Sequence, residues 1–112
     1  MPKITYEEFE KIELRSGCVV KAEPFLRAQK PAFKVWVDFG HEIGVLQTSA
    51  QITVHYTLES VVGRQVVGCV NLGEKNIAGL QSQFLLVGFA DENGAICLIT
   101  ADPKVPNGSK MC

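Results

Sequence analysis

The sequence predicts an all-β domain, a closed or nearly closed β-barrel accompanied by short helices. Three observations predict this fold class. Apolar runs of strand length follow one another along most of the chain, separated by turn signals. Residues 33–39 alternate between apolar and polar types, as a half-buried strand does. Asn93 and Gly94 stand between two apolar runs, an arrangement typical of a β-hairpin turn.

The length and composition allow one globular domain. The chain has 112 residues, with 46% hydrophobic and 21% charged residues, which excludes disorder and collagen-like sequence. The chain has 11 basic and 12 acidic residues, so its net charge is close to zero. Net charge therefore does not attract the protein to nucleic acid or to an anionic membrane. No apolar run approaches the roughly 18 residues that span a bilayer. The first residues turn acidic at once and contain no apolar core of a signal peptide. We therefore expect a cytoplasmic protein without membrane insertion.

A short helix is expected over residues 5–11. Thr5 and Glu8 have the spacing of a capping box, in which each side chain satisfies a backbone N–H of the first turn. Phe9 and Ile12 then share one face of the helix. We therefore expect about two helical turns that rest on an apolar surface.

Five or six short strands are expected from the apolar runs between turn signals. They cover residues 18–22, 33–39, 43–48, 65–71, 84–89 and 95–100. A helix over roughly 50–62, stopped by Gly63, is expected between the third and fourth strands, and 72–81 is expected to be a long loop. A five-stranded Greek-key barrel with this helix position is the OB fold. OB folds bind ligands on strands two and three and through two loops, here 24–32 and 72–83.

The sequence shows no catalytic or metal-binding motif. It contains no nucleophile elbow, no H-E-x-x-H, no Walker loop and no dinucleotide fingerprint. The four cysteines form no C-x-x-C pair, and only two histidines, His41 and His55, could join them. His55 has no partner nearby in the sequence, although a constellation assembled in space leaves no linear motif. We therefore expect no enzyme activity, no cofactor and no metal site.

Basic residues are enriched in one stretch that covers the first expected strand, its loop and the start of the second strand. The stretch contains a single acidic residue, Glu23, beside five basic ones: Arg15, Lys21, Arg27, Lys30 and Lys34. On an OB fold such cations can meet phosphates. The alternative is a solvated face whose charge is balanced by glutamates elsewhere in the chain.

Trp36 shares one side of its expected strand with Lys34 and Asp38. A large aromatic beside charges suggests a surface covered by a subunit, a peptide or a stacked base. The alternative is that a helix of the same domain covers the ring.

Two serines are further candidates. Ser82 follows the glycine-bearing loop, where a hydroxyl at the mouth of a barrel can bind phosphate or sugar. Ser49 has the same chemistry, but we favour it as the cap of the expected helix.

Several segments, taken in order, resemble the tRNA-binding OB domains that are appended to some aminoacyl-tRNA synthetases. The first two segments that carry this resemblance are 13–17 and 20–23. The others are 30–34, 37–40, 49–52, 76–79 and 105–108, and they narrow the resemblance to the CsaA-type export chaperones. The similarity runs over about residues 9–110.

The resemblance implies a single tRNA-binding-type OB domain over 1–112, with an N-terminal helical segment, 1–16, and an irregular C-terminal extension, 101–112. It also implies a cytoplasmic homodimer that binds unfolded or precursor polypeptides in connection with protein export. Because dimerisation in the family uses the N-terminal helix and segments outside the barrel, Phe9 and Ile12 are expected at the dimer interface.

Two binding hypotheses follow. As a peptide-binding chaperone, the protein is expected to use four residues: Trp36, Phe84, Lys30 and Lys34. As a tRNA-binding module, it is expected to use Arg27, Lys30, Lys34 and Ser82.

Departures from the tRNA-binding relatives bear on this choice. Those relatives usually carry Ile-Arg-Gly-Val in the second loop, followed by a serine and Gly-Met. Here Ala78 stands in the arginine place, and Phe84 and Leu85 stand in the Gly-Met places. The lost cation and the added apolar bulk favour an apolar ligand. Because Lys30 and Lys34 remain, weak RNA binding stays open.

Overall fold

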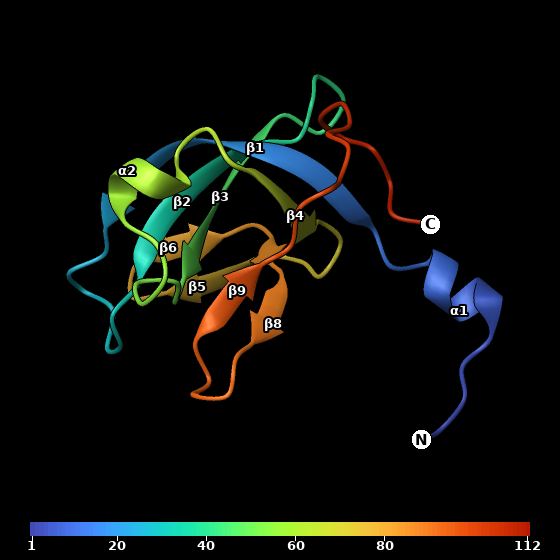
Figure 1. Ribbon diagram of the computed structural model, residues 1–112, viewed down its shortest axis with the longest axis horizontal. Coiled ribbons are helices and arrows are strands. Elements are labelled where there is room, and N and C mark those ends of the chain that lie inside the picture. The colour runs from blue at the N-terminus through green and yellow to red at the C-terminus, as the bar shows by residue number, and fades with distance from the viewer.

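Five antiparallel strands form the main sheet in the order β3-β2-β1-β4-β7, in a computed structural model that describes residues 1–112 (Figure 1). The strands are β1 (Leu14–Pro24), β2 (Phe33–Asp38), β3 (Val45–Ala50), β4 (Gln65–Cys69) and β7 (Leu85–Leu86). The central strand, β1, begins earlier than predicted and bends where its register shifts between Val19 and Lys21. Such an irregularity increases the curvature that a closing sheet needs.

The barrel is nearly closed by hydrogen bonds between β3 and the segment that leads into β7. The backbone N–H of Gln83 donates to the carbonyl of Gln47 at 2.8 Å. The Thr48 hydroxyl donates to the carbonyl of Phe84 at 2.7 Å. The two edge strands therefore meet, and the strand order is that of the OB fold. The predicted fold class is confirmed.

The core fills the barrel with side chains at alternate strand positions. Val35, Val37 and Phe39 are buried, as the alternation over 33–39 predicted. The ring of Phe39 packs edge-to-face on Phe84, with 5.0 Å between centroids. Gly68 lies against both rings, because a Cβ there would stand 2.7 Å from Cζ of Phe39. Only glycine lets β4 pass this close to the aromatic pair.

Two short helices flank the barrel, and neither is long and apolar enough to cross a membrane. The first, α1 (Tyr6–Glu10), has the predicted capping box: the N–H of Glu8 donates to Thr5 Oγ1, and the N–H of Thr5 donates to the Glu8 carboxylate. The second, α2 (Leu58–Val61), is capped by Thr57 in the same way.

The prediction of a helix over residues 50–62 is wrong for all but its last turn. Thr48, Ala50 and Ile52 are buried at every second position, so the chain keeps the period of a strand until it turns. Ser49 consequently belongs to β3 and caps no helix.

The stretch 72–81, predicted as a loop, contains a hairpin of β5 (Lys75–Ile77) and β6 (Leu80–Ser82). Its two-residue turn has positive φ at both positions, 49° at Ala78 and 89° at Gly79. Such turns usually carry Asn or Gly at the first position. Alanine there gave no turn signal, which is why the hairpin was missed.

The second hairpin was predicted correctly at its turn. It consists of β8 (Gly88–Ala90) and β9 (Ile96–Leu98), and the N–H of Asp91 donates to the carbonyl of Ala95 at 2.8 Å. The single strand predicted over 84–89 is divided, because β7 pairs with β4 and β8 pairs with β9.

The end of the chain runs beside the first half of β1. The N–H of Ser16 donates to the carbonyl of Ser109 at 3.0 Å, and the N–H of Gly108 donates back to Ser16 at 2.8 Å. The N–H of Met111 donates to the carbonyl of Leu14 at 2.8 Å. The tail is irregular, as predicted, but it is tied to the barrel by its backbone.

Candidate functional site

A cavity of about 420 Å³ opens between the β1–β2 loop and the β5–β6 turn, within the two loops predicted to meet a ligand. Arg27 and Lys30 bring two positive charges to its lining. Ala28, Ile77 and Ala78 make an apolar wall that the sequence analysis did not single out. The cavity can therefore receive an apolar group that has a negative charge beside it.

A small second core holds the β1–β2 loop against the β5–β6 hairpin. Phe25, Ala32 and Leu80 are buried together, and the N–H of Phe25 donates to the carbonyl of Ala32 at 3.2 Å. Nζ of Lys34 lies 5.1 Å from the centroid of the Phe25 ring. The loop that carries Arg27 is thus held in place by packing.

The guanidinium of Arg27 lies over the β5–β6 turn. A Cβ added to Gly79 would stand 3.2 Å from Nη1 of Arg27. This position is next to Ala78, where the sequence lacks the arginine of the tRNA-binding relatives. The turn therefore still has a cation beside it, supplied by a different loop.

Two further depressions adjoin this cavity, with volumes of about 480 and 410 Å³. All three border Ser49 of β3, and we call the three together the β3 groove. The second depression, of about 480 Å³, is bordered by Leu72 and Ile77. The third depression, of about 410 Å³, is bordered by Ile96. Leu85 borders both of these and remains half exposed. The groove is cationic at one end and mixed in the second depression, which also contains Glu74 and Lys75. It is mainly apolar in the third depression.

The predicted site residues are only partly brought together. Arg27 and Lys30 line one end of the β3 groove, and Ser82 and Phe84 border its second depression. Lys34 stands one strand away, since its register partner on β3 is Ser49.

Trp36 lies on the outer side of β2 and does not line the groove. Nζ of Lys21, its register partner on β1, lies 4.7 Å from the centroid of the indole ring. Lys21 also pairs with Glu23 at 3.2 Å. The ring is half buried, with the ammonium of a neighbouring lysine over it.

Phe84 and Ser82 both border the second depression of the groove, but their side chains also hold structural positions. We expected Phe84 among the peptide contacts, but its ring is 5% exposed and fills the barrel beside Phe39. Ser82 is buried, and its Oγ accepts the N–H of Ser49 at 3.2 Å, which helps to close the barrel. A linear pattern shows that a residue is apolar or polar but not that its side chain faces inward.

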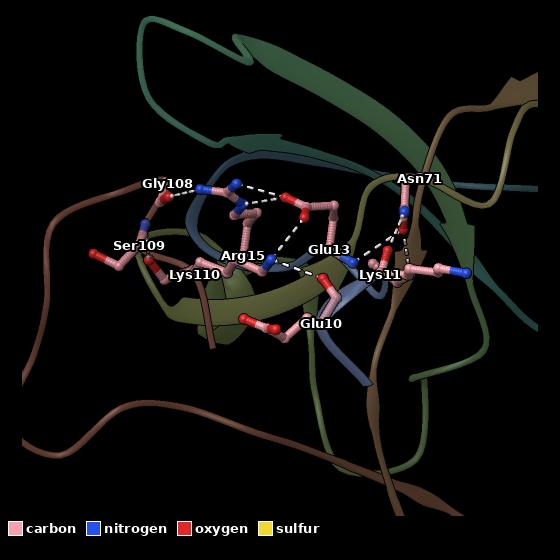
Figure 2. A network of polar contacts seen from close by, with 10 residues as sticks. Glu10, Lys11, Glu13, Arg15, Asn71, Gly108, Ser109 and Lys110 are labelled. Atoms are coloured by element: carbon pink, nitrogen blue, oxygen red, sulfur yellow. Dashed lines mark hydrogen bonds and ion pairs between the residues drawn. The ribbon is translucent and has the colours of Figure 1, made fainter. Parts of the chain in front are cut away.

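A polar network fixes the root of α1 to the end of the chain (Figure 2). The Glu13 carboxylate accepts hydrogen bonds from Nε of Arg15 at 3.0 Å and from Nζ of Lys110 at 2.9 Å. Nζ of Lys110 also donates to the carbonyl of Glu10 at 2.8 Å. Oδ1 of Asn71 accepts the N–H of Glu13 at 3.0 Å. The network therefore sets the direction in which α1 leaves the barrel.

The hydrogen bonds from Arg15 and then Lys110 lower the pKa of Glu13 below its ordinary value of 4.5. A carboxylate with a lowered folded-state pKa stabilises the fold above its ordinary pKa, and this contribution is lost as the pH falls through the folded-state value. We therefore expect Glu13→Gln to lower the melting temperature at neutral pH. The difference from wild type should shrink below about pH 4.

Thermal unfolding followed by circular dichroism over a pH series checks this expectation. Glu7→Gln is the matched control, because Glu7 lies on α1 and makes no hydrogen bond or ion pair. A Glu13→Gln difference that stays constant from neutral to acid pH would contradict the role given to the ion pairs.

The apolar face of α1 is uncovered within one chain. The helix stands away from the barrel, and none of its residues is buried (Figure 1). Phe9 is half buried, and Ile12 is 42% exposed. Near the root of the helix lies a mostly apolar pocket of about 240 Å³, bordered by residues that include Leu14, Ile99 and Met111. Both predicted interface residues are thus accessible to a partner.

Residues 14–110 match the tRNA_bind family, described as "Putative tRNA binding domain". The chain belongs to this family. The methionine–tRNA ligase of Chlorobium chlorochromatii is 34% identical over 98% of the chain, and that of Pyrococcus furiosus is 35% identical over 99%. The chain spans only about 15% of the length of these ligases. The similarity is therefore to one tRNA-binding domain within these longer ligases.

Solved structures of chains of similar size share the whole fold. The chaperone CsaA from Bacillus anthracis is 39% identical with a TM-score of 0.92, and the match covers 99% of this chain and 100% of that one. The CsaA chaperone from Picrophilus torridus is 34% identical with a TM-score of 0.92, covering 98% and 100%. A MetRS-related protein from Pyrococcus horikoshii is 30% identical with a TM-score of 0.87, covering both chains fully. The resemblance seen in the sequence is confirmed.

Proposed function

We propose that this protein is a homodimeric chaperone that binds unfolded or precursor polypeptides in connection with protein export. The observation that carries the proposal is the β3 groove, which joins a cationic end at Arg27 and Lys30 to apolar walls at Leu85 and Ile96. The similarity to CsaA chaperones over nearly the whole chain supports it. The location in the cytoplasm stays a prediction.

An extended polypeptide suits the groove because its side chains alternate in direction and can enter separate depressions. Burying one leucine- or phenylalanine-sized side chain contributes roughly 1.5–3 kcal/mol. An exposed ion pair with Arg27 or Lys30 contributes about 0–1 kcal/mol. Apolar contacts therefore decide the affinity, and the two cations favour clients with acidic residues beside an apolar run.

The homodimer is proposed because a second copy can cover the apolar face of α1. Phe9 and Ile12 lie near the pocket bordered by Leu14 and Met111, so one copy offers both a projecting helix and an apolar recess. Two grooves on one assembly would let a long client bind at two points, which raises the effective affinity without new kinds of contact.

Fluorescence anisotropy with a labelled, unfolded precursor tests the groove. We expect Leu85→Ser to weaken binding about fivefold, because burying the exposed half of that side chain contributes about 1 kcal/mol. Val54→Ser is the matched control, since Val54 is 74% exposed and lies outside the groove. No binding at tens of micromolar, an affinity of roughly 6 kcal/mol, would remove the proposal. Equal effects of the two variants would show that the groove is not the polypeptide-binding site.

tRNA binding is the second candidate, supported by the family match over 14–110. Its cations would be Arg27, Lys30 and Lys34, whereas the Oγ of Ser82 is already bonded within the barrel. The same titrations with tRNA separate the two candidates. Three phosphate contacts should weaken binding about 20- to 40-fold between about 50 and 200 mM salt. A flat salt response would exclude tRNA, while polypeptide binding through apolar contacts should persist.

A further inference from the structure

Three side chains with metal-ligating atoms meet beside the β8–β9 hairpin. His55 comes from the loop between β3 and α2, Asp91 from the hairpin turn and Cys97 from β9. Their ligating atoms all lie within 4.8 Å of one another, and Nε2 of His55 lies 2.7 Å from Oδ2 of Asp91. His55 and Asp91 are 36 residues apart, so no linear spacing indicates the cluster.

Neighbouring contacts hold these side chains in place. The Tyr56 hydroxyl accepts the N–H of Leu98 at 2.8 Å, which fixes the loop beside β9 at the residues adjacent to His55 and Cys97. Oδ1 of Asp91 accepts the N–H groups of Asn93 and Ala95, each at 2.9 Å. These bonds leave Oδ2 turned toward the histidine. Such outer contacts are what orient the ligands of a metal site.

Cys97 is placed toward the cluster by the period of its strand. Its neighbours Ile96 and Leu98 pack against the barrel core, so the Cys97 side chain leaves β9 on the opposite face. The thiol is only partly buried and forms no disulfide. Side chains of His55 and Asp91 are 42% and 19% exposed, so an ion can reach the cluster from solvent.

We propose that His55, Asp91 and Cys97 bind one divalent ion of the zinc class, with the fourth position open to water or to a further ligand. Imidazole, carboxylate and thiolate are the ligands of zinc, at bond lengths of about 2.0–2.3 Å. A tetrahedral site with these bonds places its ligand atoms roughly 3.3–3.8 Å apart. To reach these spacings, His55 would move slightly away from Asp91, now at 2.7 Å, and atoms that lie up to 4.8 Å apart would move closer. Calcium and magnesium fit poorly, because they prefer oxygen ligands.

Binding has a defined proton balance and a structural consequence. The Cys97 thiol loses its proton to solvent as the sulfur–metal bond forms, and the histidine binds as the neutral imidazole. The ion would connect the loop that carries His55 to β9. Because Ile96 borders the β3 groove, an occupied site would also fix one wall of that groove. The metal site does not depend on the identity of the groove's ligand.

Cobalt titration of the metal-stripped, reduced 112-residue chain tests the proposal. We expect one equivalent of Co²⁺ to give a thiolate-to-cobalt charge-transfer band in the near ultraviolet, which Zn²⁺ then displaces. Cys97→Ser should abolish the band. Cys112→Ser, which removes an exposed thiol elsewhere, should leave it unchanged.

His55→Gln provides a second variant for the case that Cys97→Ser unfolds. His55 is exposed, and its substitution should preserve the fold while weakening cobalt binding at least about tenfold. Zn²⁺ should raise the melting temperature of wild type but not of His55→Gln. The absence of a band at millimolar cobalt, or a band that survives in Cys97→Ser, would overturn the proposal.

Discussion

Phe39→Ala is expected to lower the free energy of unfolding by about 3–5 kcal/mol, a large part of the stability of a domain of this size. Phe39 is 1% exposed and fills the centre of the barrel. Its removal takes the edge-to-face partner from Phe84 and leaves space beneath Gly68. Val35 and Val37 lie on neighbouring strand positions and cannot fill that space without moving β2.

Urea unfolding followed by circular dichroism measures this loss, and Phe89→Ala is the matched control. Phe89 is 71% exposed, so removing its ring should change the unfolding free energy by no more than about 0.5 kcal/mol. Similar losses for the two variants would show that Phe39 does not organise the core as described.

Ile12→Asp is expected to convert the proposed dimer to a monomer. In one chain Ile12 is 42% exposed, so a carboxylate there meets water and the barrel should stay folded. In a dimer that covers the apolar face of α1, the same carboxylate would be buried without a partner, which costs several kcal/mol. Because the charge would enter the interface once per copy, the loss of association should be complete at micromolar protein.

Sedimentation equilibrium of wild type and variant checks the expectation. Val54→Asp places the same charge at a surface that is 74% exposed and is not part of α1 or the adjoining apolar pocket, so it should leave the dimer intact. Phe9→Asp should act as Ile12→Asp does. A monomeric wild type would refute the dimer, and a dimeric Ile12→Asp would refute this interface.

The fold could be predicted where local pattern and tertiary burial agree. Residues 33–39 alternate strictly, and the same residues alternate in burial within the barrel. Over residues 50–62 the local pattern and the tertiary burial disagree. The surrounding residues can form a helix, but Ile52 is buried as the next inward-facing position of the strand. At Ala78 the turn is imposed by the pairing of β5 with β6 and not by the intrinsic preference of alanine.

The candidate site could be predicted only at the level of its loops. The OB strand order placed a ligand between the β1–β2 loop and the β5–β6 region, and Arg27 and Lys30 do line a cavity there. Whether a side chain near the barrel mouth points inward or outward depends on how the barrel closes. The burial of Phe84 could therefore not be inferred from the sequence. His55 and Asp91, which lie 36 residues apart, meet where Tyr56 ties the loop between β3 and α2 to β9.

The segment 105–111, which runs beside β1, also bears on how the protein avoids aggregation. Strands with unpaired backbone groups are templates on which other chains add, and this is a common start of aggregation. The first half of β1 has β4 on one side and the segment around Ser109 on the other, while its second half is paired with β2. Residues 105–111 therefore cover the edge of the longest strand. A fusion or deletion that displaced them would expose unpaired backbone groups of β1 to other chains.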